Sequence, residues 1–346
     1  MILRCRVVLF AGLVVWSTLD PGFAQELTSR SLAAEAGVPV NRIVATIPLG
    51  SNVYPTGMVV SPDGESVYVT DFTNTNGMVT VINTATNTVK SRITIGSEPH
   101  ALTITSDGKA LYAANDSTVY VVSTVSGTVT TTLSVSLPMG LTASPDGKKI
   151  YVCTPFQNSV SIIDTANNQL IPNAIKAGGD EIVITPNGNF GYLISENDIF
   201  VIDLANEQVT TTIQLPLKAR RAIPGFLTMS PKGNKLFINT RRSIWVVDTN
   251  TNQMIGRIAM PYSGGYQGQP GITLDGKFLY EPFTGADDVL MVNTVSNEIA
   301  GNQINVQAPQ AVAATPDGRR AYIMATSLTG NESFEGRVYV VDIRPN

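Results

Sequence analysis

Short apolar runs and polar turns alternate along the chain in one arrangement that returns many times. In its first copy, apolar residues 57–60 lead through a Ser-Pro-Asp-Gly turn to residues 66–70, and a loop then leads to residues 78–82. Proline and aspartate favour such a turn, and glycine supplies its positive φ. The turn glycine recurs at steps of 44, 39, 41, 45, 43 and 42 residues, as Gly64, Gly108, Gly147, Gly188, Gly233, Gly276 and Gly318. A period of this length predicts seven copies of one supersecondary unit.

Each copy predicts four strands, A to D, which in the first copy are residues 57–60, 66–70, 78–82 and 89–95. Strand C is the most uniform, because it is apolar almost throughout and ends in Asn, Asp or Ser in all seven copies. Such runs suit strands that neighbouring sheets cover on both faces. No helical period interrupts them. We therefore predict an all-β chain that forms a seven-bladed β-propeller with four-stranded blades.

The two ends of the repeat region complement each other. Residues 42–47 resemble strand D of the first copy, whereas the last copy ends four residues after its strand C, residues 337–342. We therefore expect residues 42–48 to pair with residues 337–343 and to complete the last blade. Closing the ring in this way removes its open edges. Deleting residues 25–47 should then lower the stability by several kcal/mol, because a whole strand of burial is lost.

The repeat also carries a short motif near the end of strand B. It reads Tyr68-Val69-Thr70-Asp71 in the first copy, and strand C follows the pattern V-x-V-I-D-T. Over residues 42–343 the chain resembles the YVTN-type β-propeller repeat family. The resemblance implies the propeller fold and a surface or periplasmic location. It implies no single activity, because related propellers include scaffolds, lactonases and redox-enzyme domains. Other copies alter the tetrapeptide, as in Tyr112–Asn115, Tyr151–Thr154 and Tyr280–Phe283.

The first 24 residues have the organisation of a signal peptide. Arg4 and Arg6 precede an apolar stretch, residues 7–16, and Gly22-Phe23-Ala24 offers a cleavage site. The apolar stretch is about half of the roughly 20 residues that a spanning helix needs. We divide the chain into a signal peptide (1–24), a leader or linker (25–41) and the propeller (42–346). The mature protein is expected to be exported to the periplasm, the medium or the cell surface, as a monomer without a transmembrane segment.

Charge and cysteine content limit the chemistry. Cleavage would remove two arginines and one aspartate, which changes the formal net charge from −4 to −5. An acidic chain does not attract phosphate backbones, so no nucleic-acid partner is expected. Only Cys153 would remain, and we interpret it as an inert buried thiol. With His100 as the one histidine, the chain cannot form a zinc or copper centre. We predict no cofactor and no metal, although calcium in the channel stays open.

Insertions between the copies indicate which face of the propeller binds. The connections from B to C and from D to A vary in length, and strand parity places both kinds on one face. The positions eight residues before each turn glycine should surround the channel mouth there: Thr56, His100, Met139, Asp180, Gly225, Gly268 and Gln310. With the neighbouring polar residues, the candidate ligand-binding set is Thr56, His100, Asp180, Glu181, Arg220, Arg221, Arg241 and Gln310.

Two functions are compatible with this face. In the first, an exported binding or scaffold protein presents it to a protein partner or to a small anionic ligand, because guanidinium groups bind carboxylate and phosphate bidentately. In the second, a lactonase-like hydrolase uses His100 as general base, Glu181 as its partner, and Arg220 or Arg241 to stabilise charge. Copies two and four would lie nearly opposite on the ring, so His100 and Glu181 would meet only across a ligand. The simpler interpretations are a partly buried histidine and a solvated rim of arginines.

Overall fold

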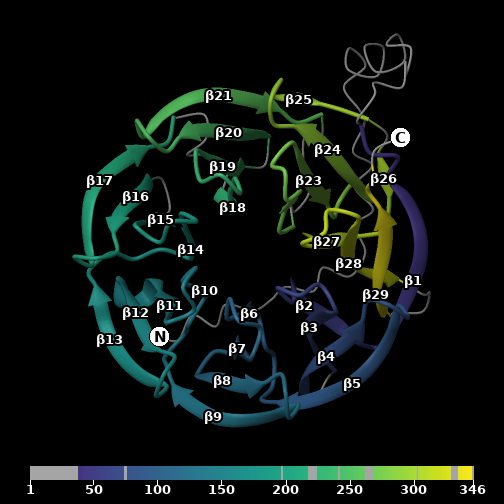
Figure 1. Cartoon of the computed structure of the whole chain (residues 1–346), viewed down its shortest axis with the longest axis horizontal. Coiled ribbons are helices and arrows are strands. Elements are labelled where there is room, and N and C mark those ends of the chain that lie inside the picture. Colours follow the sequence, from purple (N-terminus) through teal and green to yellow (C-terminus); the bar gives the residue numbers. More distant parts are fainter. Residues whose placement is uncertain are drawn as a thin grey trace, which may run out of the picture.

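Seven antiparallel sheets surround a central axis, and each sheet is one of the repeat units (Figure 1). The computed structural model describes residues 38–73, 76–195, 198–216, 224–240, 242–261, 268–301, 303–328 and 334–344. Within each blade, strand A lies nearest the axis and strand D forms the rim. The expected seven-bladed β-propeller is therefore confirmed.

The blades follow one another in chain order. Blade one consists of β2 (Tyr54–Val60), β3 (Ser66–Phe72), β4 (Gly77–Asn83) and β5 (Thr88–Ile95). Blade two consists of β6 (Ala101–Ile104), β7 (Ala110–Ala114), β8 (Thr118–Ser123) and β9 (Thr128–Ser134). Blade three consists of β10 (Gly140–Ala143), β11 (Lys149–Thr154), β12 (Ser159–Asp164) and β13 (Gln169–Ile175). Blade four consists of β14 (Glu181–Ile184), β15 (Phe190–Ile194), β16 (Asp198–Asp203) and β17 (Gln208–Gln214). Blade five consists of β18 (Pro224–Met229), β19 (Lys235–Thr240), β20 (Ser243–Asp248) and β21 (Gln253–Ala259).

The last two blades depart from the pattern. Blade six has β22 (Gly271–Ile272), β23 (Phe278–Phe283) and β24 (Asp288–Asn293), and its strand D is split into β25 (Glu298–Ile299) and β26 (Ile304–Asn305). Blade seven has β27 (Pro309–Ala314), β28 (Arg320–Leu328) and β29 (Phe334–Asp342), and β1 (Arg42–Ser51) supplies its strand D. The pairing of β1 with β29 runs from Arg42↔Asp342 to Ser51↔Glu335. This is the predicted closure of the ring.

The turns between strands A and B repeat one hydrogen-bonded design. In blade two, the Asp107 carboxylate accepts from the Thr105 hydroxyl at 2.6 Å and from the Lys109 amide at 3.0 Å. The turn glycine has a φ between 68° and 74° in all seven blades, a conformation in which a Cβ is strained. The Thr124 hydroxyl of the C–D turn donates to Gly108 O at 2.7 Å. The A–B and C–D turns therefore share one face, as strand parity predicts.

A second repeated contact joins some of the blades to the next. A tyrosine in strand B donates its hydroxyl to an asparagine of positive φ in the C–D turn of the following blade. Tyr112 reaches Asn168 at 2.7 Å and Tyr192 reaches Asn252 at 2.8 Å. Tyr280 of blade six reaches Asn41 at 2.8 Å. Because Asn41 immediately precedes β1, the closing strand brings its own copy of this contact to blade seven.

Blade five lacks the contact, because Phe237 stands where other blades have tyrosine. The corresponding asparagine of blade six, Asn297, has a buried Oδ1 without a hydrogen-bond partner among the described residues. We expect Phe237→Tyr to raise the free energy of unfolding by about 0.5–1.5 kcal/mol, the usual net value of such a bond. Tyr192→Phe should lower it by a similar amount. Urea denaturation measures both, and a destabilised Phe237→Tyr would show that the hydroxyl does not fit.

The hydrophobic core lies between adjacent blades. Val67 and Val69 of blade one pack with Met324 and Val338 of blade seven, and similar clusters occupy the other junctions. Strand C is buried almost completely in blade six, where only the last residue of β24 is not buried. Among the described residues the one helix is η1 (Pro155–Gln157), and none is long and apolar enough to span a membrane.

Candidate functional site at the channel mouth

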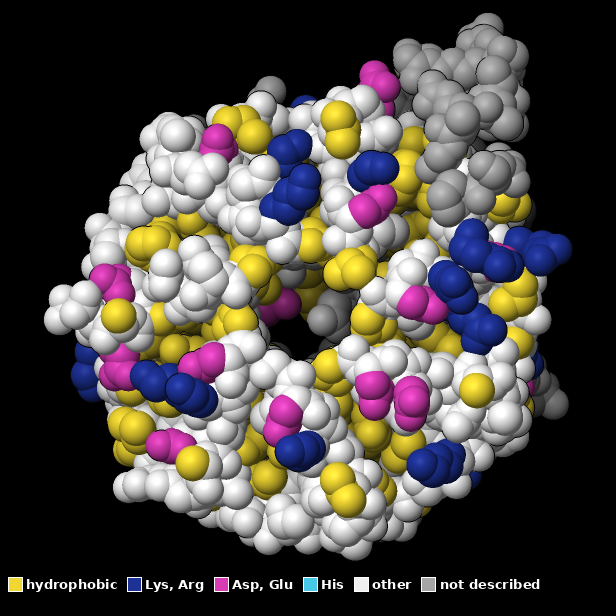
Figure 2. Space-filling model, viewed as in Figure 1, with side chains coloured by type: hydrophobic (Ala, Val, Ile, Leu, Met, Phe, Trp, Pro, Cys, Tyr) yellow, Lys and Arg dark blue, Asp and Glu magenta, His cyan; other side chains and the backbone are white. Residues whose placement is uncertain are grey.

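The seven positions that precede each turn glycine by eight residues lie around one cavity on the axis. Thr56, His100, Met139, Asp180, Gly225, Gly268 and Gln310 all line it. The cavity has a volume of about 490 Å³, which is within the range of roughly 300–1,000 Å³ for small-ligand sites. Figure 2 views the ring from the side of the A–B turns and shows that its centre is hollow. The repeat register thus brings together residues that are far apart in the sequence.

Several of these polar side chains connect one blade to the next. The Thr56 hydroxyl donates to Pro99 O at 2.5 Å, from blade one to blade two. His100 Nε2 lies 2.6 Å from Pro138 O, from blade two to blade three. Because a carbonyl oxygen only accepts, this nitrogen must carry the proton. The Gln310 amide donates to the Tyr54 hydroxyl at 2.9 Å, from blade seven to blade one. These three candidates therefore also hold the mouth together.

Glu181 makes the equivalent connection from blade four to blade five. Its Oε2 accepts a hydrogen bond from the Leu227 amide at 2.8 Å. Burial raises the pKa of Glu181 to about 7, and the negative charge of Asp180 adds to this effect. Asp180 itself is exposed. The mouth therefore presents one exposed carboxylate and one carboxyl whose pKa is raised toward neutral pH.

Much of the remaining described lining is apolar. Met58, Leu102, Met139, Leu141, Phe226 and Met324 contribute to it, and this part of the lining contains no lysine or arginine. Arg220, Arg221 and Arg241 lie outside the residues that the structure describes. The expectation of a small anionic ligand rested on these three arginines. The described lining instead offers two carboxyl groups beside apolar side chains.

His100 and Glu181 are closer on the ring than we expected. Only blade three separates blade two from blade four, so the nearly opposite placement was wrong (Figure 1). Both residues line the same cavity, but no hydrogen bond or ion pair between described residues joins them. The Nε2 of His100 is committed to Pro138, and its Nδ1 lies 3.9 Å from the exposed Asp116 carboxylate. The base and partner of the hydrolase hypothesis are therefore not assembled.

Two further polar residues at the mouth were missed. The backbone N–H of Gln269 donates to the backbone carbonyl of Gln310 at 2.8 Å, and the Thr284 hydroxyl donates to Pro309 O at 2.7 Å. Both tie blade six to blade seven, and both line the cavity. Thr284 belongs to the B–C connection, whereas counting eight residues back from each turn glycine finds only positions at the start of strand A. Its place directly after β23 was the available signal.

Elsewhere, blades five and six bury a polar pair that was also missed. The Asn239 amide donates to Glu281 Oε2, and both side chains are completely buried. Asn239 Oδ1 and Glu281 Oε1 have no hydrogen-bond partner among the described residues. Burial raises the pKa of Glu281 well above its ordinary value of 4.5. A glutamate inside an apolar strand B was the signal for this pair.

Two other side chains of chemical interest, Cys153 and Trp245, pack as parts of the structure. Cys153 is fully buried, which raises its pKa well above the ordinary range and agrees with an inert thiol. Trp245 lies under the Arg257 guanidinium, 5.6 Å from the ring centroid. In the part of the chain that the structure describes, no group of three or more His, Cys, Asp or Glu is placed to hold a metal ion.

Comparisons with known proteins support the fold. No family model matches the chain. The chain is 29% identical over 171 residues to the seven-bladed beta-propeller protein Rv1057 of Mycobacterium tuberculosis, a match that spans 48% of this chain and 40% of that protein. Hydrazine synthase of Kuenenia stuttgartiensis superposes with a TM-score of 0.72 at 18% identity, covering 84% of this chain and 96% of that one. The Cps50 (Swd1) β-propeller domain of Myceliophteria thermophila superposes with a TM-score of 0.70 at 14% identity, covering 88% of this chain and 99% of that one. At these identities the two structures show the fold alone.

Proposed function

We propose that this protein is a non-catalytic binding propeller that takes up a basic side chain of a protein partner at the channel mouth. The observation that carries the proposal is the joint lining of one cavity by all seven strand A positions. Because every blade contributes to this cavity, a ligand bound there would contact residues of all seven blades. Related propellers serve as scaffolds, which agrees with a role in binding.

The chemistry of the mouth favours a basic group. A lysine or arginine has an apolar stem and a charged head. The stem would pack against Met139 and Phe226, and the head would lie beside Asp180. Because Asp180 is exposed, it presents its charge to an incoming partner. The two carboxyl groups disfavour an anionic ligand, unless Arg220, Arg221 and Arg241 reach the mouth.

A short peptide tests this proposal. We expect acetyl-Gly-Arg-Gly-amide to bind the whole protein more tightly than the citrulline analogue, which has the same shape without the charge. Asp180→Asn should weaken arginine-peptide binding about fivefold, or about 1 kcal/mol, as expected for an exposed charge pair. Calorimetric titration measures both effects.

Asp146→Asn is the matched control, because it removes one carboxylate from the opposite face. It should change stability and leave peptide binding intact. If an acidic peptide binds instead, and Arg220→Ala or Arg241→Ala abolishes that binding, the anionic-ligand hypothesis replaces ours. If Asp146→Asn abolishes binding and Asp180→Asn does not, the working face is the other one.

We also propose that the protein is exported and that its repeats are related to the YVTN type. Residues 1–37 lie outside the described structure, so this proposal rests on the signal-like organisation of residues 1–24 and on the Tyr68–Asp71 motif. Terminal sequencing of the secreted or periplasmic fraction should find a mature chain that starts near Gln25. An intact Met1 in a cytosolic fraction would contradict export.

A further inference from the structure

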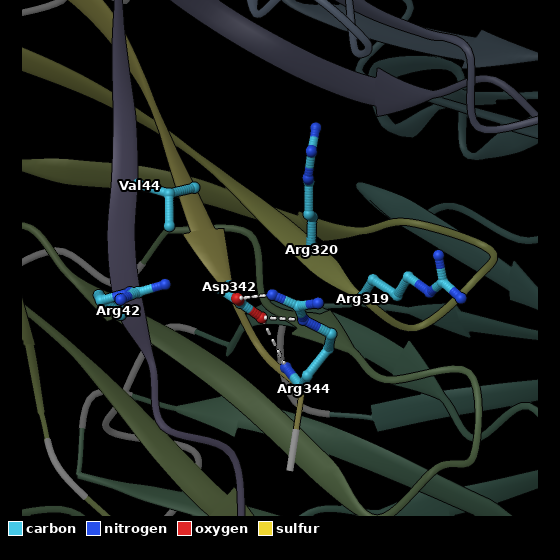
Figure 3. Close-up of a pocket in the computed structure, with 6 residues that line it drawn as sticks. All are labelled: Arg42, Val44, Arg319, Arg320, Asp342 and Arg344. Atoms are coloured by element: carbon cyan, nitrogen blue, oxygen red, sulfur yellow. Dashed lines mark hydrogen bonds and ion pairs between the residues drawn. The ribbon is translucent and has the colours of Figure 1, made fainter. Parts of the chain in front are cut away.

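Four arginines gather at the seam where the chain closes its ring, on the face opposite to the channel-mouth cavity. Arg42 begins β1, Arg319 and Arg320 lie at the start of β28, and Arg344 follows β29. Together with Val44 and Asp342 they line a hollow of about 230 Å³ (Figure 3). On the space-filling surface, dark blue side chains gather over this end of blade seven (Figure 2). We call this hollow the seam pocket.

The strand register places three of these residues in one row. Asp342 on β29 pairs with Arg42 on β1 and with Arg320 on β28. Asp342 is the one carboxylate of the lining, and Arg344 already binds it: Nε donates to Oδ1 at 2.9 Å and Nη2 donates to Oδ2. This contact lowers the pKa of Asp342 to about 2. Asp342 is therefore ionised and already paired at neutral pH.

The charge of the seam pocket is unusual for this chain. Four arginines and one aspartate give the lining a net charge of +3, whereas the whole chain has a formal net charge of −4. Arginine cannot lose its charge in this pH range, so the excess persists at every physiological pH. A small hollow with several fixed positive charges attracts anions and raises their local concentration.

Two of the arginines are held in place, and two remain available. Arg344 is bound to Asp342, and Arg320 Nη1 donates to Thr84 O of blade one at 2.7 Å. The Arg42 side chain has no hydrogen bond or ion pair with another described residue, and Arg319 makes one long contact of 4.0 Å to Asp317. Each guanidinium offers five N–H donors, so Arg42 and most donors of Arg319 stay available. The pocket therefore combines fixed charges with uncommitted donors.

We propose that the seam pocket binds a phosphate group. A carboxylate is a planar monoanion that one guanidinium fork satisfies. A phosphate is tetrahedral and carries up to two charges, so it uses donors that reach it from several strands and offsets more of the excess charge. Arg42 from β1 and Arg319 beside β28 lie on either side of β29. Figure 3 draws the Arg319 side chain turned away from Arg42, so a phosphate bound between them would draw both long side chains toward it. This site is independent of the channel mouth.

Titration of the whole protein with inorganic phosphate, at constant ionic strength set with sodium chloride, tests the proposal. We expect saturable binding by calorimetry. Arg42→Ala combined with Arg319→Ala should weaken it at least tenfold. Arg42→Lys with Arg319→Lys should also weaken it, because lysine keeps the charge and loses the bidentate fork.

Lys148→Ala combined with Lys277→Ala is the matched control. These exposed lysines follow the turn glycines of blades three and six, as Arg319 does in blade seven, so the pair removes the same charge from the same face. The control should bind phosphate within twofold of the parent. If the arginine and lysine double variants lost phosphate affinity equally, or if the parent protein bound no phosphate saturably, the proposal would be overturned.

The phosphate could be free or carried by a lipid. Flotation with phosphatidylcholine vesicles, with and without phosphatidic acid, separates the two sources. Flotation that requires phosphatidic acid and is lost in the Arg42→Ala, Arg319→Ala variant indicates a phosphate on a lipid. Binding of inorganic phosphate without flotation indicates a soluble ligand. If neither probe distinguishes the arginine variant from the lysine control, the pocket does not bind phosphate.

Discussion

Replacing Ile47 and Leu49 with alanine together should lower the free energy of unfolding by about 4–8 kcal/mol. Both side chains are at most 2% exposed and pack into the cluster between blades seven and one, with Val338 and Met324 as neighbours. Each truncation of a buried Leu or Ile costs about 2–5 kcal/mol, because it loses apolar burial and leaves a cavity. A loss of this size approaches the whole stability of many domains. Urea denaturation, followed by near-ultraviolet circular dichroism, measures it.

The same strand provides its own control. Ile43 and Val44 are 37% and 44% exposed, so replacing both with alanine should cost about 1 kcal/mol or less. If the two double variants were equally destabilised, β1 would stabilise the ring through its backbone pairing alone. Deletion of residues 25–47 extends the test, and a truncated protein that melts at the parent temperature would show that the ring does not need its closing strand.

The architecture could be read from the sequence because each blade repeats it. The turn glycine and the apolar strand C recur in every copy at similar spacing, and five copies share the turn aspartate, so a strand that is unclear in one copy can be located from the others. The closing strand was predictable for the same reason, since residues 42–47 have the pattern of a strand D. The tyrosine-to-asparagine contact could have been found in the same way. Asn41 is the exception, because no strand C precedes it in the sequence. Only its contact with Tyr280 shows its role.

The site was less predictable, because repetition hides what each blade does differently. Register placed Thr56, His100 and Gln310 at the mouth, but it could not show that they bond to neighbouring blades. Those partners are backbone carbonyls and a tyrosine about 40 or more residues away. The seam pocket was missed for a related reason. Arg320 and Asp342 belong to strands B and C of the last copy, whereas Arg42 lies at the other end of the sequence, and only the pairing of β1, β29 and β28 aligns the three.

The buried pair between blades five and six should make the protein less stable as the pH rises. Burial raises the pKa of Glu281 above its ordinary value of 4.5, so the native state keeps a proton that the unfolded chain releases. The contribution of Glu281 is complete below pH 4.5. It declines by about 1.4 kcal/mol per pH unit while the unfolded carboxyl is ionised and the native one is protonated. The protonated form also accounts for both orphaned atoms, because an Oε1–H can donate to Asn239 Oδ1 while the Asn239 amide donates to Oε2.

Glu281→Gln should therefore remove this part of the pH dependence. The glutamine amide can donate to Asn239 Oδ1 as the protonated acid does, but it does not titrate. We expect equal stability of parent and variant at pH 4.5, and a variant that is more stable by about 1–3 kcal/mol at pH 7, the usual cost of a buried polar group that lacks its partner. Asp71 and Glu181 also have raised pKa values, of about 6 and about 7, but both are present in parent and variant, so the difference isolates Glu281. Glu281→Ala, which leaves Asn239 without a partner, should be destabilised at both pH values. A Glu281→Gln variant that keeps the pH dependence of the parent would show that Glu281 is ionised in the native protein.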